Sequence, residues 1–276
     1  MQLKFIKFMT LALTVALLAI GTQACSKKKS DRVTVKGSTT VLPISQKAAE
    51  AFKKKEGISV SVEGSGSGNG IKALIDGGCD IANSSREMKA EENESAKSKG
   101  VVVKEIVAAY DMIVPIVHPS NPVKNLTMDQ LKAIYDGSIT NWKELGGKDE
   151  NIVVISRDTS SGTYEIWHEK VMRKNDVRPD ALLQASNGAI ITTVAGNPKA
   201  IGYVGFGYIN TSVRGLTINN IQISIENGKT GKFPVSRKLY MYVNEMKLSA
   251  QAKKFIDFIL SDDGQTLARE AGYIPL

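Results

Sequence analysis

The sequence predicts an α/β protein that is built on a largely parallel sheet. Short apolar runs rich in β-forming residues alternate with helical patterns through most of the 276 residues. Two longer extended stretches interrupt this alternation, one at 110–118 and one within a return segment at 234–243. We therefore expect two α/β lobes, with the break between them near the first stretch and the return near the second.

The first part of the chain alternates strands and helices. Pro43 suits the first turn of a helix, where its missing N–H costs no hydrogen bond. A glycine-rich turn at 64–70 separates the second strand from a short helix. The predicted strands are 33–35, 58–62, 80–82 and 101–107, and the predicted helices are 43–55, 71–75 and a solvated one at 89–99.

The second part repeats this alternation. Thr127 and Gln130 have the spacing of a capping box, which predicts a helix start. Pro115 suits an edge or crossing strand at 110–118, because proline cannot donate to a central ladder. The remaining predicted strands are 152–155, 201–204 and 239–243, and the remaining helices are 127–135, 162–173, 189–194, 250–260 and 265–271, with the last two packed back on the first lobe.

The N-terminus predicts export. Lys4 and Lys7 precede a short apolar run at 8–20, which is typical of a signal peptide over residues 1–24. Cys25 follows Ala24 as in a bacterial lipobox, although Thr22 stands where such boxes usually have leucine. We expect a lipid anchor on Cys25, a tether over 25–32, and a location in the periplasm or on the outer face of a bacterial membrane. Ordinary cleavage beside an incidental cysteine is the alternative.

Composition excludes several classes of protein. The net charge is +8, but the basic residues are scattered and aromatic residues make up only 6% of the chain, so a nucleic-acid surface is not expected. Two cysteines and two histidines argue against a zinc or iron site. Cys79 is expected to be a small buried apolar residue. No metal and no cofactor are predicted.

Four loops that follow predicted strands are rich in hydrogen-bond donors: 37–40, 64–70, 84–86 and 156–163. Each loop alone also fits an ordinary connection, and each arginine an exposed ion pair. In open α/β sheets, however, ligands gather at the carboxyl ends of strands, where helix N-termini favour an anion. Arg86 and Arg157 could each form fork-shaped bonds to an oxyanion. Four such loops at one topological place predict an oxyanion site.

Neighbouring catalytic and nucleotide motifs fail. Asn69 occupies the last position of a G-x-G-x-x-G pattern, and Ile223 stands where a P-loop needs its first glycine. No G-x-S-x-G elbow is present. His168 lies seven positions after Ser161, too far along a helix to act as its base. The chain is therefore not expected to be an enzyme.

Residues 33–276 resemble the phosphate-binding proteins of bacterial ABC phosphate importers, particularly their short lipoprotein members. The resemblance rests on five motifs in order: GSTTVLP (37–43), GSGSGNGIKAL (64–74), DIANSSREM (80–88), SRDTSSGT (156–163) and FPVSRKLYMYV (233–243). It implies a two-lobed periplasmic binding protein fold of type II-like topology with two crossing hinge strands. The lobes would comprise 33–111 plus 237–276 and 112–236.

The resemblance also implies the binding residues. It assigns phosphate contacts to Ser38, Thr39, Thr40, Ser67, Ser85, Arg86, Arg157, Ser161, Gly162 and Thr163. Ser85 stands where longer members have an aspartate that accepts the phosphate proton. Asp158 is then a candidate for that role, or for orienting Arg157, and Asp111 is a weaker one.

The predicted function is capture of inorganic phosphate between the lobes, by a monomer, and its delivery to a permease whose ATPase drives import. A receptor for sulfate or molybdate, a secreted phosphatase-like enzyme, and a sensor or adhesion protein without transport are the alternatives.

Overall fold

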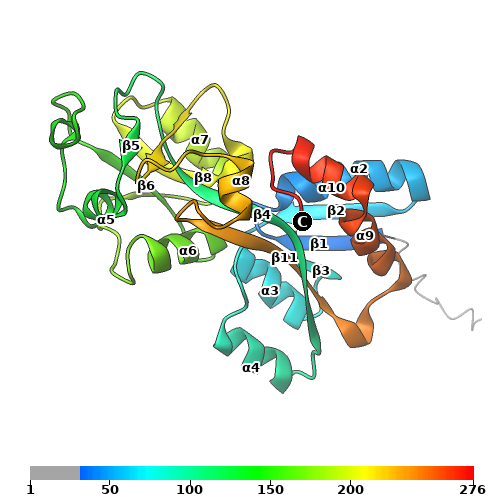
Figure 1. Cartoon of the computed structure of the whole chain (residues 1–276). Coiled ribbons are helices and arrows are strands. Elements are labelled where there is room, and N and C mark those ends of the chain that lie inside the picture. Colours follow the sequence, from blue (N-terminus) through cyan, green and yellow to red (C-terminus); the bar gives the residue numbers. More distant parts are fainter. Residues whose placement is uncertain (1–31) are drawn as a thin grey trace, which may run out of the picture. The chain divides into compact units, whose positions relative to one another are not determined.

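The computed structural model describes residues 32–276, which form a mixed α/β body with a curled sheet and surrounding helices (Figure 1). The predicted signal peptide, Cys25 and most of the predicted tether lie outside the described residues. Arg32, which the prediction assigned to the tether, already begins the first strand. From Arg32 onward, the chain contains no helix whose length and apolar content would suit a membrane span.

The main sheet has the order β2-β1-β3-β11-β4-β8-β6-β7, with β9 beside β4. Neighbours within β2-β1-β3 and within β8-β6-β7 are parallel, whereas β11 and β4 are antiparallel to the strands beside them. The strands of this sheet are β1 (Arg32–Gly37), β2 (Ser59–Gly64), β3 (Ile81–Ser84), β4 (Val103–Val117), β6 (Val153–Arg157), β7 (Leu182–Gln184), β8 (Ala200–Gly205), β9 (Arg214–Gly215) and β11 (Ser236–Asn244). A separate small pair joins β5 (Asn125–Leu126) and β10 (Thr217–Ile218).

Most of the described helices start where the local sequence supplies a side-chain cap. Thr127 accepts from the N–H of Gln130, and the Gln130 side chain accepts from the N–H of Thr127, so the predicted capping box is confirmed. The helices are α2 (Leu42–Glu56), α3 (Ser67–Ile75), α4 (Ala90–Ser98), α5 (Met128–Asp136), α6 (Gly162–Lys170), α7 (Asn187–Ala195), α8 (Ile225–Lys229), α9 (Ala250–Leu260) and α10 (Asp262–Glu270).

Several helix boundaries differ from the prediction, and the start of α3 and the end of α6 are two of them. α3 begins at Ser67, so half of the predicted glycine-rich turn belongs to the helix. α6 ends at Lys170 instead of residue 173, because the chain turns at Arg173 and Lys174, whose φ angles are 53° and 67°. Both boundaries depend on turn geometry, which hydrophobic periodicity does not report.

β4 corrects the sequence prediction, which divided it into strands 101–107 and 110–118. It is one continuous strand that pairs with β11 along its first part and with β8 and β9 along its second. Pro115 therefore lies in an internal strand, not at an edge. The proline is tolerated because its carbonyl still accepts from the N–H of Leu216 at 2.8 Å, although it can donate nothing. β4 and β11 thus run together through the middle of the sheet (Figure 1).

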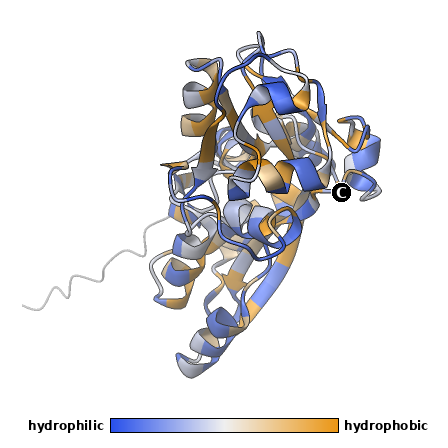
Figure 2. Cartoon of the chain, turned by 90° about the vertical axis from the view of Figure 1, so that its left-hand side faces the viewer, coloured by the Kyte–Doolittle hydropathy of each residue, from blue (hydrophilic) through white to orange (hydrophobic). Residues whose placement is uncertain are grey.

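The apolar side chains gather in separate clusters. One surrounds Trp142, Trp167 and Tyr203 beside the second part of β4, and another packs α2 and α9 against β1. Trp167 stacks on Tyr203 with ring centroids 4.2 Å apart. Several strands contain hydrophobic stretches, and many loop residues are hydrophilic (Figure 2). The prediction that α9 and α10 return to the first part of the chain is confirmed by their contacts with α2.

Candidate functional site

The loops at the carboxyl ends of β1, β2, β3 and β6 supply the predicted site residues. All ten residues assigned to phosphate are buried: Ser38, Thr39, Thr40, Ser67, Ser85, Arg86, Arg157, Ser161, Gly162 and Thr163. Polar side chains without catalytic or binding work are rarely so buried. Nine of them, together with Gly162, therefore mark this place as a candidate site.

The structure brings loops from distant parts of the chain into contact. The hydroxyls of Thr40 and Thr163 lie 3.0 Å apart, and those of Ser67 and Ser85 lie 3.3 Å apart. A Cβ at Gly162 would lie only 2.5 Å from Ser67 Oγ and 2.8 Å from Ser85 Oγ. Glycine is thus needed at position 162, because it lets the first turn of α6 approach these hydroxyls.

Arg157 is the buried charge of the site. Its side chain is 1% exposed; Nε donates to the carbonyl of Gln184 at 3.0 Å and Nη2 to that of Ala185 at 3.0 Å. Nη1 is buried and has no hydrogen-bond partner among the described residues. Burial lowers the pKa of the guanidinium from its ordinary value. A fixed cation with an unused N–H group suits an anionic ligand.

The N-terminus of α6 adds further donors. Ser161 is the N-cap, and its hydroxyl accepts from the N–H of Tyr164 at 3.2 Å. The N–H groups of Gly162 and Thr163 have no acceptor within the helix, since they belong to its first turn. Together with the helix dipole, they favour negative charge at this end.

Arg86 is directed toward a carboxylate of the protein. Its Nη1 and Nη2 donate to the two Glu92 oxygens at 2.7 and 2.8 Å, and Nη1 also donates to the carbonyl of Glu87. Glu92 lies in the first turn of α4 and provides the countercharge that a buried guanidinium needs. The role of Arg86 in anion binding stays a prediction.

Two residues that the sequence prediction missed join the site. Asn187 Nδ2 donates to the hydroxyls of Thr39 and Thr40, both at 3.1 Å. Arg237 donates to the Thr163 hydroxyl at 3.0 Å and to the Thr40 hydroxyl at 3.3 Å. Arg237 stands inside the FPVSRKLYMYV motif, which was a signal that went unused. Asn187 had no comparable signal in the sequence.

The two candidate proton acceptors have different environments. Asp111 is fully buried; its Oδ2 accepts from Arg237 Nε and Nη2 at 2.9 and 2.7 Å, and its Oδ1 accepts from the N–H of Phe206. Burial raises the pKa of Asp111, against the opposing effect of Arg237. Asp158 Oδ1 accepts from the N–H of Ser160 at 2.9 Å, whereas its Oδ2 lies 4.0 Å from Arg157 Nη2. Asp158 Oδ2 thus has capacity for another donor.

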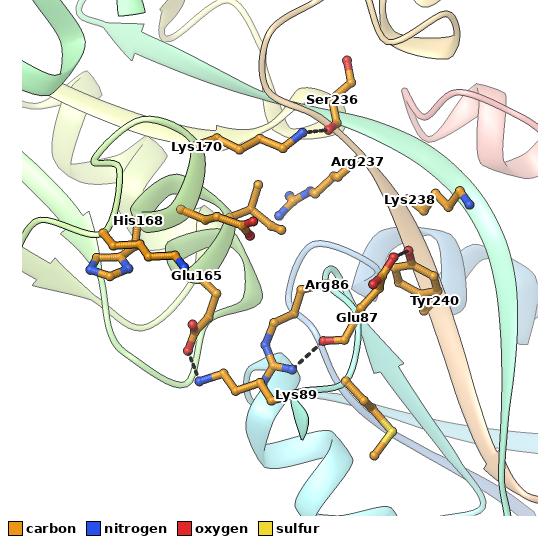
Figure 3. Close-up of a pocket in the computed structure, with 14 residues that line it drawn as sticks. Arg86, Glu87, Lys89, Glu165, His168, Lys170, Ser236, Arg237, Lys238 and Tyr240 are labelled. Carbon is orange, nitrogen blue, oxygen red and sulfur yellow. Dashed lines mark hydrogen bonds and ion pairs between the residues drawn. The ribbon is translucent and has the colours of Figure 1, made fainter. Parts of the chain in front are cut away.

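An open pocket of about 750 Å³ adjoins the buried loops, because Arg86 and Arg237 line it (Figure 3). Lys89 and Glu165 form an ion pair of 2.6 Å at one side of the pocket. His168 lies here and stacks on Tyr164.

Cys79 is half-buried and its pKa is raised to about 12, mainly by burial. Within residues 32–276, no His, Cys, Asp and Glu side chains are grouped as metal ligands.

The chain is similar to known proteins over most of its length. The family model of a PBP superfamily domain matches residues 22–263. The phosphate-binding protein PstS of Staphylococcus saprophyticus is 34% identical over 272 residues, which cover 93% of this chain and 84% of that protein. The protein of the same name from Borreliella burgdorferi is 32% identical over 263 residues, which cover 91% of this chain and 92% of that protein.

The fold is also similar to solved structures of phosphate-binding proteins. A phosphate ABC transporter substrate-binding protein from Clostridium perfringens, solved with bound phosphate, matches with a TM-score of 0.84 and 38% identity, covering 89% of this chain and 99% of that one. An ABC-type phosphate transport receptor from Vibrio cholerae matches with a TM-score of 0.72 and 33% identity, covering 88% of this chain and 100% of that one.

Proposed function

The chain belongs to the PBP superfamily and, within it, to the phosphate-binding proteins named PstS; we propose that it captures inorganic phosphate and delivers it to an ABC import permease. The predicted two-lobed α/β periplasmic binding protein fold is thereby confirmed. The relatives are binding proteins, and we extend this to a chain that performs no catalysis itself.

The observation that carries the proposal is the free Nη1 of buried Arg157 beside the N-terminus of α6. An unpaired guanidinium N–H in a dry site costs free energy unless a ligand accepts from it. A tetrahedral anion supplies several acceptor oxygens at once. The neutral hydroxyls of Thr163 and Ser38 and the backbone N–H groups of α6 then hold the remaining oxygens without adding charge.

We assign the acceptor of the phosphate proton to Asp158. Both Asp111 oxygens already accept from protein donors, whereas Asp158 Oδ2 accepts no hydrogen bond from the described residues. Sulfate carries no proton near neutrality, so a free carboxylate oxygen repels it and discriminates in favour of phosphate.

Calorimetry tests the proposal. The protein is titrated with phosphate, sulfate and molybdate at about pH 5.5 and about pH 8, on both sides of a phosphate ionisation. We expect one phosphate per chain, with sulfate and molybdate at least about 100-fold weaker, which is a gap of at least about 2.7 kcal/mol. Equal competition by sulfate at both pH values would contradict the assignment, and turnover of a chromogenic phosphoester would contradict the absence of catalysis.

Export and anchoring complete the proposal. The relatives include phosphate-binding proteins and a phosphate ABC transporter substrate-binding protein, which supports an extracytoplasmic location, and we propose a lipid on Cys25 as the membrane attachment. We further propose that the chain acts as a monomer. Membrane release by Cys25→Ser, measured by fractionation with radiolabelled palmitate, tests the anchor. Light scattering tests the oligomeric state.

A further inference from the structure

Arg237 links both sides of the candidate site from a position on β11. Its side chain is 3% exposed and holds Asp111 on β4 by two hydrogen bonds of 2.9 and 2.7 Å. The same head group donates to Thr163 Oγ1 at 3.0 Å and to Thr40 Oγ1 at 3.3 Å. Register explains the reach, because Arg237 pairs directly with Asp111 across β11 and β4.

Hydrogen-bond directions in this cluster follow from the donors. The N–H of Gly205 donates to Asn187 Oδ1 at 3.1 Å, so the other amide atom is the NH₂ group that faces Thr40. A guanidinium can only donate. Thr40 Oγ1 therefore accepts from both Asn187 and Arg237, which fills the two lone pairs of the hydroxyl. Its own proton is left for Thr163 Oγ1, 3.0 Å away.

The same reasoning fixes the hydrogen bonds of the Thr163 hydroxyl. Its Oγ1 accepts from Thr40 and from Arg237 Nη1, so both lone pairs are occupied. No carbonyl among the described residues accepts the Thr163 hydroxyl proton. The proton is therefore available to a ligand in the site, beside the N–H groups of α6.

The three arginines of the site differ in whether a carboxylate neutralises them. Arg237 is neutralised by Asp111, and Arg86 is neutralised by Glu92. Arg157 has its nearest carboxylate at 4.0 Å, in the partly exposed Asp158. Arg237 thus contributes little net positive charge to the site, and what it contributes is the direction of two hydroxyl groups.

We infer that Arg237, held by Asp111, is a positioning residue for anion binding, which orients the Thr40 and Thr163 hydroxyls so that Thr163 donates to the bound anion. The inference rests on the proposed function and adds to it a residue that acts through others without touching the anion. It predicts that Arg237 and Thr163 are energetically coupled in phosphate binding.

A double-mutant cycle tests this coupling. Asp111→Asn with Arg237→Gln removes both buried charges together, so no unpaired charge remains, and Thr163→Val removes the oriented hydroxyl. We expect each change to weaken phosphate binding about tenfold, and the combined protein to be weakened only about as much as either one. Thr193→Val is the matched control, since the Thr193 hydroxyl bonds the Ala189 carbonyl within α7 and should combine additively.

Arg237→Lys provides the second measurement and keeps the buried ion pair. A lysine ammonium keeps the charge but cannot hold Asp111 and both threonine hydroxyls in the fixed geometry of a guanidinium. We expect at least about a fivefold loss of phosphate affinity, with an unchanged melting temperature of the ligand-free protein. Additive losses in the cycle, or wild-type affinity in Arg237→Lys, would overturn the inference. Absence of phosphate binding by the wild-type protein would instead refute the proposed function.

Discussion

The N–H of Gly68 donates to the carbonyl of Ser160 at 3.1 Å, which joins the first turn of α3 to the loop before α6. The contact is tight. At neighbouring Gly66, a Cβ would lie 2.5 Å from Ser160 Oγ and 2.9 Å from the Ser160 carbonyl oxygen. Gly66 also has a φ of 101°, which side-chain-bearing residues rarely adopt.

Gly66→Ala should therefore separate the two loops and weaken phosphate binding by at least about tenfold, because the site needs donors from both. Gly57→Ala is the matched control: its φ is 70°, yet no atom lies within 4 Å of the added Cβ. We expect Gly57→Ala to lower the free energy of unfolding by about 1 kcal/mol and to leave phosphate affinity unchanged. Calorimetry and thermal melting distinguish the two effects.

Arg157→Ala should cost at least about 100-fold in phosphate affinity, since charge-assisted hydrogen bonds in a buried site contribute about twice as much as neutral ones. Arg173→Ala serves as the control, because Arg173 is exposed and paired with Asp129. Calorimetry at constant pH measures both variants. Near-wild-type affinity of the Arg157 variant would show that the anion does not contact this guanidinium.

Asp158→Asn should reduce selectivity more than affinity. The amide can still accept through its oxygen, but it no longer repels a fully ionised anion, so sulfate should compete more strongly against phosphate. We expect the phosphate-to-sulfate affinity ratio to fall by about tenfold. Asp129→Asn, far along the chain and exposed, is the control. An unchanged ratio would remove Asp158 as the proton acceptor.

The Lys89–Glu165 ion pair joins the start of α4 to the first turn of α6 and should slow phosphate release. Both side chains are partly exposed, at 36% and 24%, so the pair should contribute no more than about 1 kcal/mol. We expect Lys89→Gln and Glu165→Gln each to raise the release rate by up to about fivefold at low salt, and the double variant to equal either single one. High salt screens the ion pair, so stopped-flow measurements at high salt should show a smaller difference in release rate between the wild type and the variants.

Tyr203 should make the fold less stable at high pH. Burial raises its pKa to about 12, opposed by bonds to Ser156 and to the N–H of Arg157. An unfolded tyrosine ionises near pH 10, so between about pH 10 and pH 12 the unfolded state releases a proton that the folded state retains. The contribution of Tyr203 to the free energy of unfolding is fully present below this window and falls by about 1.4 kcal/mol per pH unit within it.

Tyr203→Phe removes this contribution. Denaturant unfolding at about pH 8 and about pH 11 should show a smaller loss between the two pH values in the variant than in the wild type. The comparison is made within each protein, because Tyr203→Phe also loses two hydrogen bonds at every pH. An equal loss in both proteins would contradict the assignment of the alkaline loss to Tyr203.

Local features of the fold were predictable because their causes are local. The capping box of Thr127 and Gln130, the proline in the first turn of α2 and the apolar β-forming runs of β1, β2 and β8 depend on neighbours within a few residues. The donor-rich loops were predictable for the same reason, since each follows a strand and opens a helix. Arg157, Ser161 and Thr163 could therefore be named as candidates without any contact information.

Contacts over long sequence distances were not predictable from these patterns. Arg237 and Asp111 meet because β11 and β4 pair in one register, and that register is set by the burial of both strands. Asn187 reaches Thr39 only because α7 packs beside β8 and β6. Arg86 resembled a second anion ligand in the sequence, yet the position of α4 brings Glu92 to its guanidinium.

The sequence by itself predicted the alternation of strands and helices, the donor-rich loops and an arginine within two of them, a pattern that favours an anion. Tertiary structure decided which of these groups remain free to bind one. Hydrogen bonds and ion pairs form over about 3 Å, so a side chain's availability depends on the partners that packing brings within that reach. Packing gave Arg86 and Arg237 carboxylate partners and left Arg157 Nη1 without one.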